Sequence, residues 1–482
     1  MTLKFKNDSN LETQLIAPLL QKYSVSIPRY TSYPTAPEWN EHFSFSKNDF
    51  TSACEKANKS KTPVSLYFHL PFCENQCYFC ACNVVISKKR DVTTPYLTHI
   101  KKEIENTSKL INKETLVEQI HLGGGTPTYF TGAELKDFFN FVKNNFNFSK
   151  KCEIGIEIDP RVTDAEHIKI LSELGFNRLS MGIQDFNEKV QEIVNRVQSF
   201  ELTNNLFHTA RDSGFESINI DLMYGLPHQT EETFKRTIEL ILKLNPDRIA
   251  LFHYAHLPQM INHQAKYIPE NALPGSDTKI KIFLYAVQEL GKNGYEFIGL
   301  DHFAKPKDEL AIARKNKTLH RNFQGYTTKA GCDLYGFGIT AISNIQDTYS
   351  QNLKKLNDYY SQIDLNEIPI FKGMTLSKDD ILRKEIIMKI LCHGEIVKSE
   401  IEEKYSINFD RYFSFETEKL KEFEKDGVLI NHVLEGHGKP CPYSSGIQVT
   451  TLGQFFLRNI ASVFDSYLQK KNAKQKIYSK SI

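Results

Sequence analysis

The chain has 482 residues, 40% of them hydrophobic and 24% charged, a composition that excludes disordered and fibrous classes of protein. The net charge of +2 gives no global signal for nucleic acid or anionic membrane binding, and no run of about 18 apolar residues predicts a membrane span. Nine cysteines, together with a polar N-terminus that lacks the pattern of a signal peptide, predict a protein of the reducing cytoplasm.

Residues 1–62 are predicted to form an N-terminal arm. Residues 11–23 have the apolar spacing of a helix. Residues 28–36 contain two prolines around Arg29 and two tyrosines, which predicts an extended stretch. Two interpretations of the arm remain open: a surface strap over the following domain, or a flap that brings Arg29 to an acidic substrate.

Strands and helices alternate from residue 64 onward. Runs rich in branched or aromatic residues predict strands over 64–70, 118–122, 153–158, 178–183, 217–223 and 247–252. Helical periodicity predicts helices over 96–111, 134–144, 164–174, 202–213, 231–244 and 278–293. Strands separated by helices are typical of a parallel α/β sheet, open or curled into a barrel, and we assign this domain to residues 63–364.

The pattern changes in the last part of the chain, residues 365–482. Helices are predicted over 378–391, 398–405, 415–426 and 452–467, and a β-hairpin over 428–434 and 446–450 around a loop insertion at 435–445. This domain is therefore expected to be mainly helical and winged-helix-like. Because acidic residues alternate with its lysines, we predict a packing or substrate-covering role and no nucleic acid partner.

Four cysteines lie within ten residues directly after the first predicted strand: Cys73, Cys77, Cys80 and Cys82. Thiolates this close together on one loop, spaced C-x3-C-x2-C-x-C, predict a metal centre. Two interpretations remain open on spacing alone. One is a closed four-thiolate zinc or iron–sulfur site with a structural role. The other is an iron–sulfur cluster held by the first three cysteines, with one iron left open for a substrate.

Polar and glycine residues follow the other predicted strands. A Gly-Gly-Gly-Thr-Pro run begins at Gly123, and glycine lets a backbone approach a ligand closely. Side chains that can hydrogen-bond a ligand lie on or after later strands: Glu157, Gln184, Asp221, His253 and His256. Because the C-terminal ends of barrel strands share one rim, these groups predict a small-molecule site beside the cysteine loop. We interpret the two histidines as hydrogen-bonding groups.

These motifs resemble those of the radical S-adenosylmethionine (SAM) enzymes. More narrowly, the chain is similar to the oxygen-independent coproporphyrinogen III oxidase (coproporphyrinogen dehydrogenase) family. Beyond the cysteine and glycine motifs, the resemblance rests on RYTSYPTA at 29–36, CACN at 80–83, SMGIQDFN at 180–187, NIDLMYGLP at 219–227, YAHLP at 254–258, DHFA at 301–304 and HRNFQGYTT at 320–328.

The resemblance implies a radical-SAM partial (β/α) barrel and a [4Fe–4S] cluster held by Cys73, Cys77 and Cys80, with SAM on the open iron. It implies that SAM yields a 5′-deoxyadenosyl radical, which takes hydrogen from a substrate propionate. Loss of one electron and carbon dioxide then leaves a vinyl group. Acting on two propionates, this chemistry converts coproporphyrinogen III to protoporphyrinogen IX in heme biosynthesis without oxygen.

The resemblance also implies two SAM molecules side by side. The residues implied around the cluster-bound one are Tyr67, Gly124, Glu157 and Ile342. Those implied around the second are Phe79, Gly125, Thr126, Gln184, Arg196, Asp221 and Ala255. Gln324 is a further cofactor-binding candidate, Cys82 and Arg29 are catalytic candidates, and Arg29, Arg321 and Lys329 are candidates for binding substrate carboxylates.

We expect a monomer that takes electrons from a protein such as flavodoxin or ferredoxin and passes them to an unidentified acceptor. Three alternative functions are a heme-binding chaperone of the same superfamily, a closed zinc module with a winged helix, and a porphyrin-opening methyltransferase. The chaperones have Phe in place of Cys82 and lack the 29–36 segment, so both features favour the oxidase. Ala81 departs from the glycine of the family pattern, a small change that should leave the loop intact.

Overall fold

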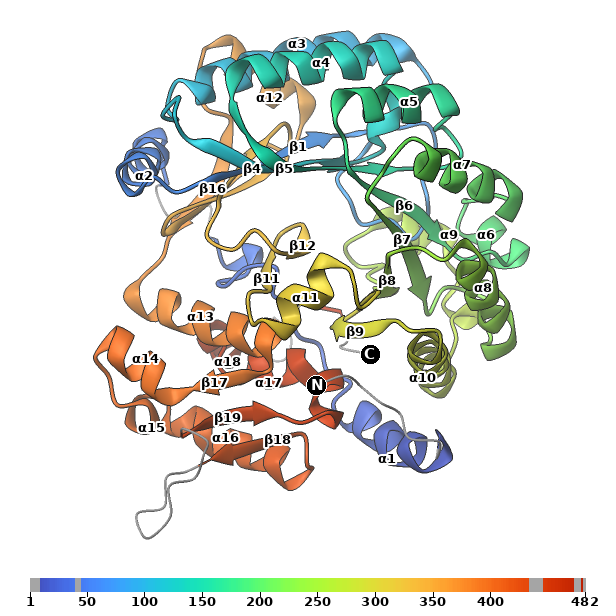
Figure 1. Cartoon of the computed structure of the whole chain (residues 1–482), viewed down its shortest axis with the longest axis vertical. Coiled ribbons are helices and arrows are strands. Elements are labelled where there is room, and N and C mark those ends of the chain that lie inside the picture. The colour runs from blue at the N-terminus through green and yellow to red at the C-terminus, as the bar shows by residue number, and fades with distance from the viewer. Residues whose placement is uncertain (1–8, 40–44, 433–444, 472–477, 480–482) are drawn as a thin grey trace. The chain divides into compact units, whose positions relative to one another are not determined.

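A computed structural model of the chain (Figure 1) describes residues 9–39, 45–432, 445–471 and 478–479. The chain packs as two compact units. The sheet unit comprises Trp39–Gly275 and Gly331–Leu376, and the terminal unit comprises Met1–Glu38, Ser276–Ala330 and Ser377–Ile482. The functional division at residues 62 and 364 remains a prediction. No helix in the described ranges is long and apolar enough to cross a membrane.

The centre of the sheet unit is a run of parallel strands that pair in chain order. They are β1 (Val64–Leu70), β4 (Leu116–Gly124), β5 (Asn147–Ile158), β6 (Arg178–Gln184), β7 (Ser217–Tyr224) and β8 (Arg248–His253). The helices between them are α3 (Thr93–Ser108), α4 (Gly132–Asn145), α5 (Ala165–Leu174), α6 (Glu188–Ile193), α7 (Phe200–Asp212) and α8 (Glu231–Leu244). The predicted parallel α/β fold is confirmed.

Local sequence explains why these elements form where they do. The strand β1 is buried at six of its seven positions, as expected for a parallel strand covered on both faces. The helix α5 begins at Asp164, whose side chain accepts a hydrogen bond from the backbone of His167, and ends at Gly175 in the left-handed conformation. Helices α3, α4, α5, α7 and α8 lie along the outer face of the curved sheet (Figure 1).

Several elements of the sheet unit escaped sequence analysis. The strand β13 (Asp333–Phe337) is parallel to β1, and β14 (Ile342–Ile345), β15 (Thr348–Asn352) and β16 (Ile370–Thr375) continue the sheet as antiparallel strands. The remaining elements are α2 (Lys47–Ser60), β2 (Phe72–Cys73), β3 (Val85–Ile86), η2 (Arg90–Val92), η3 (Pro127–Tyr129), α9 (Asn262–Tyr267), η4 (Glu270–Ala272) and α12 (Leu356–Asp364).

The terminal unit is mainly helical, as predicted for the C-terminal part. Its helices are α1 (Ser9–Lys22), η1 (Ala36–Glu38), α10 (Ser276–Lys292), α11 (Glu309–Lys315), α13 (Lys378–His393), α14 (Lys398–Tyr405), α15 (Phe409–Tyr412) and α16 (Ser414–Lys425). Two antiparallel pairs join β9 (Glu296–Gly299) to β10 (His302–Ala304) and β11 (His320–Asn322) to β12 (Gly325–Thr327).

The predicted C-terminal hairpin is present and gains a third strand. In this sheet β19 (Gly446–Val449) lies between β18 (Leu429–His432) and β17 (Glu395–Val397), antiparallel to both. The predicted insertion at 435–445 lies outside the described residues except for its last position.

The single helix predicted over 452–467 is wrong. The segment forms η5 (Leu452–Phe456), α17 (Leu457–Ser462) and a separate α18 (Ser466–Lys470). Asp465 causes the interruption, because its side chain accepts hydrogen bonds from the backbone of Tyr467 and Leu468 and so begins a new helix. Arg383 also donates to the carbonyl of Phe464 at 3.0 Å and satisfies a group that the interruption leaves open.

The arm has no helix or strand between residues 28 and 35, in agreement with the prediction. Within the terminal unit it packs on the C-terminal helices. The Tyr30 hydroxyl donates to Asp465 at 2.9 Å, and Arg458 donates to the carbonyls of Ile27 at 2.5 Å and Pro28 at 3.1 Å. Tyr30 is 1% exposed, so this extended stretch is part of the core of the unit.

Candidate active site

The cysteine loop is fixed to the ends of the neighbouring strands by backbone hydrogen bonds. The amide of Gly125 donates to Leu70 at the end of β1, and the amide of Thr126 donates to Phe72, both at 2.9 Å. Farther along the loop, the amide of Tyr78 donates to Val194 at 2.9 Å. The loop is therefore held between the strand ends of the sheet unit, at the rim that the sequence predicted.

Two glycines after β4 allow this close contact. A Cβ atom on Gly125 would lie 2.5 Å from the carbonyl oxygen of Pro71, a backbone atom that cannot move aside. Gly124 has a φ of +118°, and a Cβ there would lie 2.8 Å from the His69 ring. The Gly-Gly-Gly run thus has a steric role against the cysteine loop, beside any role in binding a ligand.

The first three cysteines have different polar neighbours. Cys73 Sγ lies 3.4 Å from the Thr126 hydroxyl, and burial raises the pKa of this thiol to about 12. Cys80 Sγ accepts from the amide of Cys82 at 3.4 Å, and hydrogen bonding with Cys82 lowers the pKa of the Cys80 thiol to about 7. The same pair raises the pKa of Cys82, so Cys80 is the stronger thiolate of the two.

Cys77 lies beside two arginines. Its Sγ is 3.3 Å from Arg161 Nη2 and 3.6 Å from Arg196 Nη1. Asp159 accepts from both guanidinium groups, at 2.6 Å from Arg161 and 3.0 Å from Arg196. Burial opposes ionisation of Asp159, yet the two arginines lower its pKa to about 2. The one carboxylate of Asp159 thus holds two cations against the sulfur atom of Cys77.

A second polar cluster contains Glu157 and Tyr67. Glu157 is bonded to His121 Nε2 at 3.2 Å and accepts from the Gly124 amide at 3.4 Å. Loss of hydration works against ionisation, but these bonds and the charge of His121 lower the pKa of Glu157. The Tyr67 ring stacks on His121, with centroids 6.2 Å apart, and its hydroxyl lies 3.2 Å from His69. Glu157 is thus an anionic acceptor beside the glycine run.

Three of the residues implied around the second SAM are Asp221, Phe79 and Ala255, and each has a hydrogen bond to a neighbouring side chain. Asp221 accepts from Asn219 at 2.7 Å and from Ser180 at 3.2 Å. Gln264, which is fully buried, donates to the carbonyls of Phe79 at 3.0 Å and Ala255 at 3.2 Å, and so ties the cysteine loop to the segment after β8. The neighbouring His256 lies 3.0 Å from the Tyr254 hydroxyl, consistent with a hydrogen-bonding histidine.

Ile342 lies on the other side of β1. It begins β14, and its carbonyl would be 2.5 Å from a Cβ on Gly336, the residue paired with Tyr67 in the sheet. The sheet unit contains Cys82, the three cysteines predicted as cluster ligands and the eleven implied SAM residues other than Gln324. Gln324 and Arg29 belong to the terminal unit.

Unsatisfied polar atoms test whether this rim fits a cofactor. Gln184 Oε1 and Arg196 Nε are buried without a hydrogen-bond partner, an acceptor and a donor of the kind that an amino acid ligand would satisfy. The four cysteines on the loop form no disulfide bond with one another. In the described ranges, no three His, Cys, Asp or Glu side chains converge on one point suitable for a single metal ion. A cubane cluster binds each cysteine through a different iron, so the donor set fits it without such convergence.

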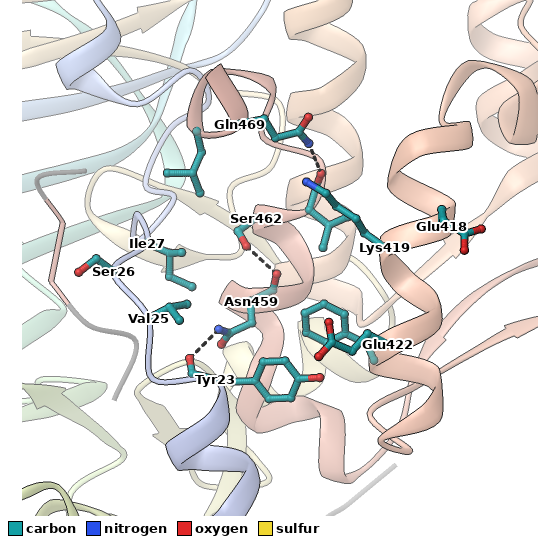
Figure 2. A pocket seen from close by; sticks show the side chains of 13 residues that line it. Tyr23, Val25, Ser26, Ile27, Glu418, Lys419, Glu422, Asn459, Ser462 and Gln469 are labelled. Carbon is teal, nitrogen blue, oxygen red and sulfur yellow. Dashed lines mark hydrogen bonds between the residues drawn. The ribbon is translucent and has the colours of Figure 1, made fainter. Parts of the chain in front are cut away.

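The terminal unit contains a cavity of about 750 Å³ (Figure 2). Its thirteen lining residues include Glu418, Lys419 and Glu422 but no cysteine or histidine. Polar groups along its wall are already bonded to the protein: Asn459 donates to the Tyr23 carbonyl at 2.8 Å, and Gln469 donates to the Val463 carbonyl at 2.7 Å. We do not assign a cofactor to this cavity.

Known proteins resemble the chain over nearly its whole length. Residues 67–241 match the Radical SAM superfamily. The oxygen-independent coproporphyrinogen III oxidase of Synechocystis sp. is 45% identical, with 97% of this chain and 98% of that protein covered. The Escherichia coli enzyme of the same name is 42% identical, with 94% and 95% covered. The chain belongs to the oxygen-independent coproporphyrinogen III oxidase family.

A solved structure supports the same family assignment. Coproporphyrinogen III oxidase from Escherichia coli, described as a radical SAM enzyme, superposes with a TM-score of 0.85 at 41% identity. The match covers 92% of this chain and all of that one. The structural similarity to this family therefore extends over the terminal unit as well as the sheet unit.

Sequence analysis missed three residues of this family member's rim. Arg161 follows β5 in the same way as the predicted rim residues, but nothing in its local sequence indicates the contact with Cys77. His121 lies inside a predicted strand, where it was treated as part of the sheet. Gln264 lies on α9, a short helix with no strong periodicity, and its bonds to two distant carbonyls appear only in the folded chain.

Proposed function

We propose that this protein converts coproporphyrinogen III to protoporphyrinogen IX without oxygen, by oxidative decarboxylation of two propionate side chains to vinyl groups. The observation that carries the proposal is 45% identity over 97% of the chain to an enzyme of that name. The arrangement of cysteines, glycines and carboxylates at one rim of the sheet unit supports the same chemistry.

Three cysteines would hold the cofactor of this reaction. In the proposal Cys73, Cys77 and Cys80 would hold a [4Fe–4S] cluster, which together with SAM would supply the radical chemistry needed at the propionate. Metal coordination deprotonates a thiol outright, so the raised pKa of Cys73 is no obstacle. Arg161 and Arg196 beside Cys77 offset the negative charge of the thiolates.

Other rim residues would bind and orient two SAM molecules. For the cluster-bound SAM we propose Tyr67, Gly124, Glu157 and Ile342. Its amino group or ribose hydroxyls suit the anionic Glu157. For the second we propose Phe79, Gly125, Thr126, Gln184, Arg196, Asp221 and Ala255. A carboxylate suits the unpartnered Nε of Arg196, and ribose hydroxyls suit Asp221.

Further roles are proposed for residues near the substrate. Cys82, which is exposed and does not ligate the cluster in this proposal, is a catalytic candidate. Arg29 in the arm is a second, and Gln324 is a further cofactor-binding candidate. The arm (1–62) is proposed to cover the active site in the barrel domain (63–364), with the C-terminal domain (365–482) completing the enzyme.

The electrons in this reaction need partners beyond the chain. Each propionate that becomes a vinyl group loses one hydrogen atom, one electron and carbon dioxide. The hydrogen atom would go to the 5′-deoxyadenosyl group derived from SAM, giving 5′-deoxyadenosine, and the electron would go to an acceptor. We propose a flavodoxin- or ferredoxin-like reductant, a monomeric enzyme and a cytoplasmic location.

The cofactor proposal is tested by anaerobic reconstitution with iron and sulfide. We expect iron and acid-labile sulfide in equal amounts, and SAM cleavage that requires reductant. The Cys73→Ala variant should lose the iron and sulfide as well as SAM cleavage, because three thiolates are needed to hold the cluster. One zinc per chain without sulfide, or full SAM cleavage by Cys73→Ala, would overturn the cofactor proposal.

A further inference from the structure

The β11–β12 hairpin of the terminal unit contains a buried arginine with unsatisfied donors. Arg321 is 5% exposed, and its Nε and Nη1 atoms are buried without a hydrogen-bond partner. A buried guanidinium without acceptors is costly, since each lost hydrogen bond leaves a desolvated charge. Native proteins rarely keep such a group unless a ligand or an ordered water completes it.

The surroundings of Arg321 leave its edges available. Its guanidinium lies 4.9 Å from the centroid of the Tyr326 ring, opposite it in the hairpin, so the ring packs near the cation without accepting its N–H groups. The Tyr326 hydroxyl donates away from it, to the Leu391 carbonyl at 2.9 Å. Gln324, in the turn of the same hairpin, also has a buried Nε2 without a partner. The hairpin therefore offers donors from two side chains.

The titratable neighbours of Arg321 do not satisfy its open donors. Asp301 is the neighbouring carboxylate, but it is bonded to His302 Nδ1 at 2.7 Å. His302, Arg321 and Arg29 all act on Asp301 and lower its pKa against the effect of burial. The neighbouring Cys392 thiol stays neutral, because burial raises its pKa to about 12. Neither group accepts a hydrogen bond from Nε or Nη1 of Arg321.

We propose that Arg321 binds a propionate carboxylate of the porphyrinogen substrate, with Gln324 as a second donor on the hairpin. The inference rests on the proposed function, which supplies a substrate with four propionates. A carboxylate suits the planar, permanently charged guanidinium better than a neutral group does. Among the three basic candidates from the sequence, Arg29 and Lys329 already take part in other interactions. Arg321 combines burial with open donors.

Binding of coproporphyrin III to the anaerobic holoenzyme without reductant tests the proposal, because this aromatic analogue keeps four propionates and does not react. We expect Arg321→Gln to weaken binding on the order of 10- to 100-fold, as for loss of a hydrogen bond to a charged group. The affinity of Arg321→Lys for coproporphyrin III should lie between those of Arg321→Gln and the wild type. With the tetraamide of coproporphyrin III, wild type and Arg321→Gln should bind alike.

Arg314→Gln is the matched control. Arg314 is a half-buried arginine of the same unit whose Nη2 already donates to Gln454 at 3.1 Å, so its variant should bind coproporphyrin III normally. The iron content of Arg321→Gln should equal that of the wild type, which separates a lost ligand contact from misfolding. If Arg321→Gln does not fold, the binding of coproporphyrin III and of its tetraamide is compared between the wild type and Arg321→Lys instead.

Two results would overturn the inference while the proposed function stands. One is turnover by the wild type together with equal binding of coproporphyrin III by Arg321→Gln. The other is thermal stabilisation of only the wild type by inorganic phosphate that does not compete with coproporphyrin III, which would make the site one for a free anion. A wild type that neither binds nor converts the porphyrinogen would instead refute the proposed function itself.

Discussion

At the scale of single residues, the contact between Arg161 and Cys77 sets the electrostatics of the proposed cluster site. A cation 3.3 Å from the sulfur of a proposed ligand would stabilise the more negative, reduced cluster. We predict that Arg161→Gln lowers the reduction potential by tens of millivolts, since about 1.4 kcal/mol corresponds to ~59 mV for one electron. Potentiometric titration followed by electron paramagnetic resonance measures this shift.

The control for this prediction is Arg236→Gln. Arg236 lies in the same unit but is exposed on α8 and paired with Glu239 at 2.9 Å, so its removal should leave the potential unchanged. An Arg161→Gln protein with full iron content and the potential of the wild type would contradict the account of Cys77.

At the scale of elements, one buried carboxyl group joins three parts of the sheet unit. Glu103 on α3 accepts from Tyr359 on α12 at 2.6 Å, from Asn352 at the end of β15 at 2.7 Å, and from the Gly338 amide at 2.8 Å. Burial raises its pKa to about 7 despite these bonds. The folded state therefore holds a proton that the unfolded chain releases near pH 4.5, the ordinary value for Glu.

This carboxyl predicts a pH dependence of stability with a definite sign. Its raised pKa stabilises the fold fully below about pH 4.5, and the contribution is lost as the pH rises through about 7. At 1.36 kcal/mol per pKa unit, the loss is about 3 kcal/mol. Urea unfolding of wild type and Glu103→Gln at pH 5.0 and 7.5 measures it. The advantage of the wild type over the variant should shrink at the higher pH, and an equal difference at both values would refute the assignment.

At the scale of the whole molecule, sequence analysis succeeded where the signal was local. The strand Val64–Leu70 and the helix Glu231–Leu244 were predicted at their observed bounds, because buried strands and amphipathic helices have strong periodicity. The helix over 452–467 was wrong because the cap by Asp465 competes with an otherwise helical pattern. Strands β13–β16 were missed because they are short and lie in a glycine-containing region.

In the candidate site too, local motifs could be predicted from the sequence and contacts between distant residues could not. The three ligand cysteines and the glycine run are adjacent in sequence and form recognisable motifs. The contact of Cys77 with Arg161 joins residues 84 apart, and that of Gln264 with Phe79 joins residues 185 apart. The open donors of Arg321 likewise become evident only when every buried polar atom has been paired. Contacts of this kind depend on the fold and leave no local pattern.

The most direct test of the central claim is the product of an anaerobic reaction with coproporphyrinogen III, SAM, a reductant and an electron acceptor. The account predicts protoporphyrinogen IX, identified by mass after oxidation, with two molecules of carbon dioxide released per porphyrin and 5′-deoxyadenosine formed for each vinyl group. Failure to form the divinyl product, with heme bound tightly by the same protein, would contradict the account and indicate a heme-binding chaperone.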